Sequence, residues 1–310
     1  MSTAVTVIIP TLGTRPRELD RAISSALNQE GVDITPLVIL NGNRYSPEVL
    51  RELSGNRAIR LHQIAVAGVS EARLEGRRQV DTAFFAFLDD DDEVLPKAMA
   101  TRIRALADTD AALVATNGYI QRDGKREIIF PNFDRSFVDP AQALLDENWL
   151  ASAGGLYRTD LVTASDLQGL PDHMEMTYLA FSIALRHRVL LIDQPTFVVH
   201  MGALDQVSQS WAYHRETSNV LAAMEVLTSR SDLVRRLRRK RAAALHACST
   251  AALRNKALRM AWQYHLASLV LSGGLRYLAY TRYLLGWPEQ LPALLRKTGT
   301  RATKSRHQHR

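Results

Sequence analysis

Residues 84–92 read Phe-Phe-Ala-Phe-Leu-Asp-Asp-Asp-Asp, an apolar run that ends in four consecutive carboxylates. Five apolar residues in a row are typical of a strand that is buried on both faces, as in a parallel sheet. Ligands of such sheets bind outside the carboxyl ends of the strands. Because the acidic run begins where this strand ends, the stretch predicts both a parallel sheet and the edge at which its functional site lies.

The eighty residues before this stretch alternate between strand and helix patterns. Val5–Ile9 is a nearly continuous β-branched run, and Pro16 is placed as the first residue of a helix. Strands are predicted at residues 5–9, 37–40, 59–64 and 84–88, and helices at 16–27, 46–53 and 70–80. This alternation predicts an α/β fold, with an open, Rossmann-like, mostly parallel sheet and helices on both faces.

The C-terminal third of the chain has a different character. Ala, Leu and Arg recur there at helical spacing, and strand patterns are scarce. We therefore expect an α/β catalytic domain over residues 1–210 and a basic helical extension over residues 211–310, with a disordered tail from about residue 296.

Composition indicates an ordinary globular protein. The chain has 310 residues, of which 46% are hydrophobic and 23% charged. The single cysteine, Cys248, cannot form an internal disulfide, which favours a reducing compartment. Val5–Ile9 is too short for a secretory signal, and no apolar run has the length of a membrane span. These features predict a cytoplasmic protein.

Positive charge is concentrated in two places. The net charge is +7 with a pI near 9.7, and the excess lies in residues 235–241 and in the tail, residues 296–310. Such patches serve nucleic acid, anionic lipid or a phosphate-bearing substrate, or they are simply a solvated helix face. No nucleic-acid-binding motif accompanies them, so we expect no nucleic-acid partner.

The acidic run itself indicates a metal site. Four adjacent carboxylates repel one another unless a cation neutralises them, and Mg²⁺ or Mn²⁺ prefers a few carboxylates together with phosphate oxygens. Alternate residues of an extended chain project to the same side, so Asp89 and Asp91 can share one target. The alternative is helix capping, which accounts for Asp92 and Glu93 but not for all the acids.

Other catalytic templates fit the sequence less well. The chain has no G-x-S-x-G, no Walker A sequence, no G-x-G-x-x-G after the first strand and no cysteine spacing for zinc. The sequence thus gives no indication of hydrolysis through a covalent nucleophile or of hydride transfer.

Three motifs, in order, resemble those of the inverting family 2 glycosyltransferases with the GT-A fold. The first is Val5-Thr-Val-Ile-Ile-Pro-Thr11, which resembles the family's opening strand and the turn after it. The second is Gly68-Val-Ser-Glu-Ala-Arg-Leu-Glu-Gly76, which resembles the family's G-x-S-x-A-R-x-x-G segment. The third is Phe87–Pro96, which contains a D-x-D motif. The resemblance covers residues 4–100 and, more loosely, extends to about 205. It implies inverting transfer of a sugar from a nucleoside-diphosphate sugar to an acceptor hydroxyl, with Mn²⁺ or Mg²⁺ as cofactor. It also implies a hexosyltransferase of cell-surface glycan or polysaccharide biosynthesis.

The resemblance assigns roles to residues that match the motifs. Asp91 matches the metal ligand, and Asp89 lies nearer the ribose while also serving the metal. Arg73 is placed to face the diphosphate, although a surface arginine on a helix is the alternative. The remaining residues assigned to nucleotide-sugar binding are Pro10, Thr11 and Asp90.

Two positions depart from the family pattern. Asn41 stands where the family commonly has an aspartate that binds the base, and because an amide both donates and accepts, the identity of the base stays open. Glu175 matches the first acid of the family's E-D pair, but Met176 replaces the second. Glu175 is the first candidate for the general base and Asp172 the second, while Glu175 could also be only a helix cap.

Two further residues have a functional and a structural interpretation. His200 resembles a late histidine of the family that lies near the metal and the diphosphate, or it is structural. Trp149 could stack on a sugar or lie in the core.

The helical extension has features that suggest contact with an anionic membrane and a glycan or lipid-linked acceptor. Besides its cations, it contains five aromatic residues: Trp262, Tyr264, Tyr277, Tyr280 and Tyr283. The protein would then lie on the inner face of the membrane.

Two rival functions remain open. A nucleotidyltransferase shares this type of sheet and the metal, but it should have a glycine- and lysine-rich phosphate-binding loop after the first strand. Thr11–Arg15 resembles such a loop only weakly. A non-catalytic nucleotide-sugar binder is the other rival, because Asn41 and Met176 depart from the catalytic pattern.

Overall fold

The computed structural model describes residues 4–131, 133, 138–201 and 211–285. Their contacts divide the chain into two compact units, the first spanning residues 1–206 and 226–233 and the second spanning 207–225 and 234–310. The predicted boundary at residue 210 and the predicted tail from residue 296 lie outside the described residues, so both stay predictions.

The first unit is built on one mixed sheet with the strand order β3-β2-β1-β4-β8-β6-β9-β5, to which β7 adds by pairing with β6. Neighbours among β3, β2, β1 and β4 are parallel, as predicted, and β6 is parallel to β9. The other pairings are antiparallel. The strands are β1 (Ala4–Thr11), β2 (Asp33–Asn41), β3 (Arg60–Ile64), β4 (Phe84–Phe87), β5 (Glu93–Val94), β6 (Leu113–Arg122), β7 (Lys125–Ile128), β8 (Gly155–Arg158) and β9 (Val189–His200).

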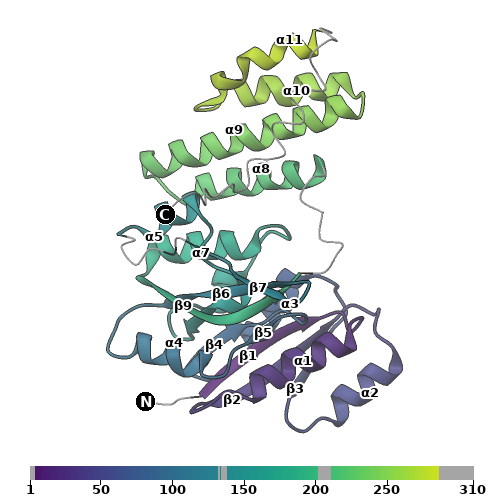
Figure 1. Cartoon of the computed structure of the whole chain (residues 1–310), viewed down its shortest axis with the longest axis vertical. Coiled ribbons are helices and arrows are strands. Elements are labelled where there is room, and N and C mark those ends of the chain that lie inside the picture. The colour runs from purple at the N-terminus through teal and green to yellow at the C-terminus, as the bar shows by residue number, and fades with distance from the viewer. Residues whose placement is uncertain (1–3, 132, 134–137, 202–210, 286–310) are drawn as a thin grey trace, which may run out of the picture. The chain divides into compact units, whose positions relative to one another are not determined.

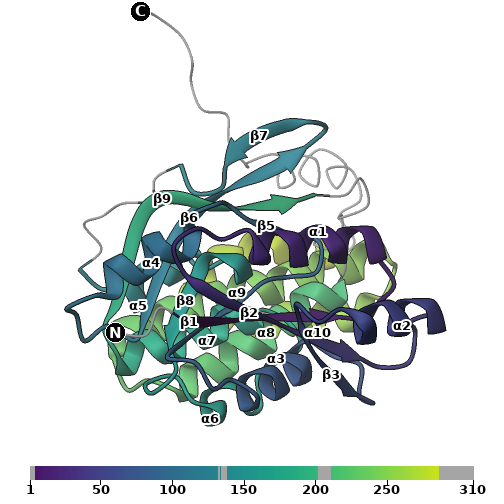
Figure 2. The same cartoon turned by 90° about the horizontal axis from the view of Figure 1, so that it is seen from below.

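Helices cover both faces of this sheet. Figure 2 shows α1 and α3 on opposite sides of β1 and β2. The helices are α1 (Pro16–Leu27), α2 (Pro47–Gly55), α3 (Val69–Arg78), α4 (Ala98–Leu106), α5 (Pro140–Asp146), α6 (Ala164–Leu167) and α7 (Glu175–Arg186), and Ser152–Gly154 forms the short 3₁₀ turn η1. The observed architecture confirms the predicted α/β fold with helices on both faces.

The two faces of β1 explain how the helices are held. Val5, Val7 and Ile9 share one buried cluster with the apolar residues of α1 and α4. On the opposite face, α3 lies so close to β1 that a Cβ on Gly76 would come within 2.4 Å of the Ile8 side chain. The last glycine of the Gly68–Gly76 motif is therefore required by close packing of a helix on a strand.

The second unit is helical. It contains α8 (Trp211–Val226), most of α9 (Ser231–Arg254), α10 (Leu258–Leu269), the 3₁₀ segment η3 (Gly274–Tyr280) and α11 (Thr281–Leu284). In Figure 1, α9 lies between α8 and the layer formed by α10 and α11. Ala252, Ala261 and Leu284 form the centre of a small apolar cluster there. Within the described residues, no helix is both long enough and apolar enough to cross a membrane.

The order of the parallel strands determines where the site forms. β2, β1 and β4 are neighbours and run in the same direction, so their carboxyl ends meet at one edge. The residues at this edge are Thr11 at the end of β1, Asn41 at the end of β2, and Asp89 to Asp92 after β4.

Candidate active site

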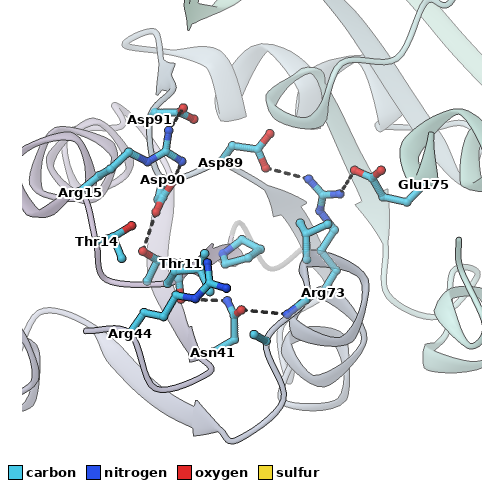
Figure 3. A pocket seen from close by; sticks show the side chains of 15 residues that line it. Thr11, Thr14, Arg15, Asn41, Arg44, Arg73, Asp89, Asp90, Asp91 and Glu175 are labelled. Atoms are coloured by element: carbon cyan, nitrogen blue, oxygen red, sulfur yellow. Dashed lines mark hydrogen bonds and ion pairs between the residues drawn. The ribbon is translucent and has the colours of Figure 1, made fainter. Parts of the chain in front are cut away.

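A pocket of about 600 Å³ opens at the carboxyl edge of β1, β2 and β4 (Figure 3). Its size is within the range of small-molecule sites, about 300–1,000 Å³. It brings together most of the residues that the sequence singled out, namely Pro10, Thr11, Asn41, Arg73, Asp89, Asp90, Asp91 and Glu175.

Arg73 is the central side chain of this pocket. It projects from α3 and is only 1% exposed, and its guanidinium forms ion pairs with both Asp89 and Glu175. The Nη2–Asp89 Oδ1 distance is 2.7 Å. Figure 3 shows the guanidinium between the two carboxylates. The alternative of a surface arginine is therefore wrong, although a contact between Arg73 and a diphosphate stays a prediction.

The charge of Arg73 depends on these two acids. Burial alone would lower its pKa, but the carboxylates of Asp89 and Glu175 outweigh burial and raise it. The guanidinium also lies over the Phe87 ring, 5.6 Å from its centroid. The structure thus holds a permanent positive charge at the floor of the pocket, with one carboxylate from the acidic run and one from α7 on either side.

Glu175 is the first residue of α7, and the chain enters the helix through an unusual conformation. Met174 has a φ of 57°, in the left-handed region that residues other than glycine seldom adopt. The side chain of Glu175 lines the pocket and is 18% exposed. Its position is therefore determined by its partner Arg73 as well as by the helix.

Arg15 binds the acidic run from the other side of the pocket. Its Nη2 lies 2.5 Å from Asp90 Oδ1, and its Nη1 binds Asp91 Oδ2. Arg15 precedes α1 and is 49% exposed. In the sequence, Thr11–Arg15 resembles a phosphate loop only weakly, so Arg15 was not predicted as a site residue. The adjacent Pro16 at the helix start was the available signal.

Negative charge is unevenly distributed along the run. Burial, and then the neighbouring Asp89 and Asp91, raise the pKa of Asp92 to about 8. Burial also raises the pKa of Asp90, although Thr11 and Arg15 oppose the rise. These shifts mean that four full negative charges at this edge would need an additional cation.

The loop after β1 is adapted to this edge. Thr11 Oγ1 donates to Asp90 Oδ2 at 2.6 Å and accepts from the Gly13 amide at 2.9 Å. Gly13 has a φ of +66°, and a Cβ there would lie 2.6 Å from the Tyr45 side chain. The glycine thus allows the chain to turn and return Arg15 to the acidic run.

Asn41 uses both ends of its amide within the protein. Its Nδ2 donates to the Thr11 carbonyl at 2.8 Å, and its Oδ1 accepts from the Gly68 amide at 3.1 Å. The residue is 3% exposed. Asn41 lines the pocket as predicted, but these bonds connect the ends of β1 and β2 to the loop before α3. If Asn41 also contacts the nucleotide base, as predicted, it must do so while its amide keeps these two hydrogen bonds to the backbone.

Two predicted site residues do not line the pocket. His200 lies at the end of β9, where its Nε2 is 2.7 Å from Glu93 Oε1 and its backbone amide donates to Asp92. Asp172 is exposed in the loop before α7. The roles of His200 at the metal and of Asp172 as a base stay predictions, without support from the lining of the pocket.

Residues around η1 complete one side of the site. Ser152 Oγ donates to Asp89 Oδ1 at 3.0 Å and lies 2.9 Å from Arg73 Nη2. Beneath this turn, the fully buried Arg102 donates to the carbonyls of Ala153 and Gly155, and burial lowers its pKa to about 9. Trp149 is 1% exposed and donates to the Pro140 carbonyl, so it belongs to the core.

The residues at this edge fit a divalent metal in part. Asp89 and Asp91 both line the pocket. Burial is the main cause of the raised pKa values of Asp90 and Asp92, and the neighbouring carboxylates add to it, so a cation at this edge would favour the ionised acids. Among the described residues, however, no three His, Cys, Asp or Glu side chains converge as a metal-binding group. A metal held here would thus take its other ligands from phosphate oxygens and water, as Mg²⁺ commonly does.

Asn41→Asp should destabilise the protein, because a carboxylate cannot donate to the Thr11 carbonyl and would face it at close range. We expect a loss of about 1–3 kcal/mol in the free energy of unfolding, the usual cost of an unsatisfied buried polar group. Urea unfolding followed by circular dichroism measures it. Asn43→Asp, at an exposed position of the same turn, is the matched control, and equal stability of both variants would contradict the structural role of Asn41.

Comparison with known proteins agrees with this geometry. The sequence profile of glycosyl transferase family 2 matches residues 6–154. No curated protein matches the chain in sequence. Similar solved structures include S. aureus TarS 1–349 in complex with UDP, with a TM-score of 0.57 and 13% identity, covering 79% of this chain and 71% of that one.

Two further structures have the same fold. TarS 1–349 in complex with UDP-GlcNAc has a TM-score of 0.57 and 12% identity, and covers 80% of this chain and 72% of that one. The mannosyltransferase PcManGT from Pyrobaculum calidifontis, in complex with GDP-Man and Mn²⁺, has a TM-score of 0.53 and 16% identity, and covers 91% and 84%. Residues 6–154 thus match glycosyl transferase family 2, and the α/β unit that contains them has the GT-A fold.

Proposed function

We propose that this glycosyltransferase moves a sugar from a nucleoside-diphosphate sugar to an acceptor hydroxyl with inversion at the anomeric carbon. The observation that carries the proposal is the pair of carboxylates, Asp89 and Glu175, held on either side of the buried Arg73 in one pocket. One carboxylate belongs to the acidic run at the sheet edge, and the other begins a helix on the far side of the guanidinium.

The pocket suits an anionic donor. Its lining includes the guanidinium groups of Arg15, Arg44 and Arg73. Arginine binds phosphate oxygens well because its planar group donates several hydrogen bonds in a fixed geometry. The similar structures hold UDP, UDP-GlcNAc or GDP-Man, which supports a nucleoside-diphosphate sugar as donor without selecting its base or its sugar.

We propose Mn²⁺ or Mg²⁺ as cofactor, held by Asp91 and Asp89, with the GDP-Man and Mn²⁺ complex of PcManGT as support. A bound metal ion would neutralise the negative charge that develops on the leaving diphosphate. The chain's own contribution is to keep Asp89 oriented through Arg73 and Ser152. His200 could be a third metal ligand only if its Nε2 atom gave up its hydrogen bond with the Glu93 carboxylate.

Inverting transfer needs one general base for the acceptor hydroxyl. Glu175 is the better candidate because it lines the pocket, whereas Asp172 is exposed outside the lining. Arg73 holds the Glu175 carboxylate toward the pocket. The carboxylate would accept the hydroxyl proton as the acceptor oxygen bonds to the anomeric carbon and the diphosphate departs.

The acceptor and the cellular location are also proposed from the resemblance to the family. We propose a glycan or lipid-linked acceptor in cell-surface polysaccharide synthesis, and a cytoplasmic protein at the inner face of the membrane. The family match favours a glycosyltransferase over a nucleotidyltransferase. A nucleotide-sugar binder without turnover remains the competing function, because Met176 replaces the second acid of the pair and is 7% exposed in the core.

A thermal-shift screen of UDP- and GDP-sugars, with and without Mn²⁺, tests the function directly. A ligand that binds the native state at 100 times its dissociation constant stabilises it by about 2.7 kcal/mol, so the correct donor should raise the melting temperature clearly. Product analysis of the same mixtures then detects slow donor hydrolysis or transfer. Stabilisation by a donor that is never turned over would favour the binder.

Glu175→Gln should separate binding from chemistry. The amide keeps the shape of the side chain and can still accept from Arg73, but it cannot take a proton. We expect kcat to fall by about 100- to 10,000-fold, the usual contribution of a general base, with a donor dissociation constant within about threefold of the wild type. Asp172→Asn is the matched control and should retain activity. A large loss in Asp172→Asn alone would assign the base to Asp172.

Arg15→Ala should change metal and nucleotide binding in opposite directions. Removal of Arg15 leaves Asp90 and Asp91 without their guanidinium partner, so Mn²⁺ should bind the nucleotide-free protein about two- to fivefold more tightly, the scale of a partly exposed ion pair. The diphosphate of UDP or GDP should bind more weakly. Electron paramagnetic resonance of free Mn²⁺ measures the first effect and calorimetry the second.

The control for Arg15 is Arg44→Ala. Arg44 lines the same pocket but has no ion pair with the acidic run in the described part of the chain. This variant should weaken nucleotide binding without changing Mn²⁺ binding. If both variants changed Mn²⁺ binding equally, the effect would come from the overall charge of the pocket and not from the contacts of Arg15.

A further inference from the structure

We propose that residues 254–285 of the helical unit form a docking surface for an anionic lipid bilayer. This segment contains the end of α9 and all of α10, η3 and α11, and we call it the lipid-facing layer. The proposal goes beyond sugar transfer and does not depend on it, because it concerns a different unit of the chain. Three observations carry it: charge, exposed apolar side chains and the packing behind them.

The first observation is that residues 234–285 carry positive charge without any acidic residue. Residues 234–285 contain no Asp or Glu, while their cations are Arg235, Arg236, Arg238, Arg239, Lys240, Arg241, Arg254, Lys256, Arg259, Arg276 and Arg282. Elsewhere in the unit, Glu225 pairs with Arg238 and Arg241. The basic block of α9 is thus partly neutralised within the protein, whereas the lipid-facing layer has no acid of its own.

The second observation is a set of large apolar side chains in water. On α10, Leu258 and Leu266 are eight residues apart and so share one face, and Leu258 is 48% exposed. Trp262 lies between them in the sequence but is half-buried against the apolar cluster of Ala252, Ala261 and Leu284. Leu266 is 54% exposed, and Val270 at the end of the helix is 83% exposed. The rest of the layer adds Leu275, Leu278 and Leu285, which are 71%, 56% and 72% exposed.

The third observation concerns the aromatic residues that the sequence suggested as membrane anchors. The Tyr277 ring stacks on His246 with 4.0 Å between centroids, and Tyr283 is 8% exposed. Tyr280 packs against His246 and His265. These rings form the inner packing of the layer, so the aliphatic residues, not the tyrosines, are the groups available to enter a membrane.

The combination of these features favours lipid over other partners. Exposed leucines interspersed with arginines match an interface that is apolar inside and anionic at its surface. Nucleic acid offers the anionic surface but no apolar interior for the leucines. A second copy of this chain offers no acidic face in the corresponding segment, so two such layers would repel each other.

Flotation of the full-length protein with lipid vesicles tests the proposal. Vesicles of phosphatidylcholine with 30% phosphatidylglycerol should bind the wild type, and pure phosphatidylcholine vesicles should bind it weakly. The double variant Leu266→Gln/Leu278→Gln should lose about tenfold or more in partitioning, because each leucine loses its transfer into an apolar phase. Arg259→Ser/Arg276→Ser should lose about fivefold for each cation, and only on anionic vesicles.

Matched variants on the α/β unit provide the controls. Val66→Gln removes a side chain that is 61% exposed, and Arg17→Ser/Arg57→Ser removes two exposed cations. Both should partition like the wild type, and thermal unfolding should show that every variant is folded. Because the basic tail is present in all of them, binding through the tail alone would leave the leucine and arginine variants unchanged, and that result would overturn the proposal.

Two other outcomes would also overturn it. Wild-type protein that binds neither kind of vesicle has no lipid-docking surface. If the leucine variants convert a dimer into a monomer in analytical ultracentrifugation without changing flotation, the layer is an interface between copies. Donor binding in the thermal-shift screen is measured independently, so failure of the membrane proposal leaves the proposed enzyme function untouched.

Discussion

The site depends on one buried guanidinium. Arg73 is almost fully covered, and a buried charge is tolerated only when carboxylates and hydrogen bonds compensate for lost water. Its partners come from distant parts of the chain: Asp89 follows β4, Ser152 lies in η1, and Glu175 begins α7. Each of these segments must therefore reach its position before the two Nη groups of Arg73 have their hydrogen-bond partners. The requirement couples formation of the site to folding of the whole α/β unit.

The helix that carries Arg73 is fixed at several points. Gly76 lets α3 approach Ile8 on β1, Ser70 donates to the Pro171 carbonyl, and Arg77 donates to the carbonyls of Val162 and Thr159. The family-like motif at residues 68–76 is thus mostly a set of packing and backbone contacts. Only one of its residues, Arg73, has a side chain that faces two acids of the pocket. A helix held this firmly can present a buried cation with little freedom to move.

Local patterns were sufficient for the parallel half of the sheet and for the edge at which the site forms. β-branched and apolar runs such as Val5–Ile9 indicate buried strands without any knowledge of their partners. They could not predict the two-residue strand β5, because Glu93-Val94 becomes a strand only through pairing with β9. Arg15 and Ser152 were missed for the same reason, since each gains its importance from a partner more than sixty residues away. Family position was informative about Asn41 as a pocket residue, yet it could not reveal that both ends of the amide bind backbone.

The acidic run shows how one stretch can serve structure and chemistry together. Along residues 89–92 the burial alternates, with Asp90 and Asp92 5% exposed and Asp89 and Asp91 more open. The buried pair binds protein groups, Thr11 and Arg15 for Asp90 and the His200 amide for Asp92. The backbone here is a tight turn, in which the Asp92 amide donates to the Asp89 carbonyl at 3.1 Å, and not the extended chain that the sequence suggested. Asp89, Asp90 and Asp91 all line the pocket from this turn. The four carboxylates are therefore not equivalent: Asp90 and Asp92 are buried in the turn after β4, whereas Asp89 and Asp91 are more exposed and pair with Arg73 and Arg15.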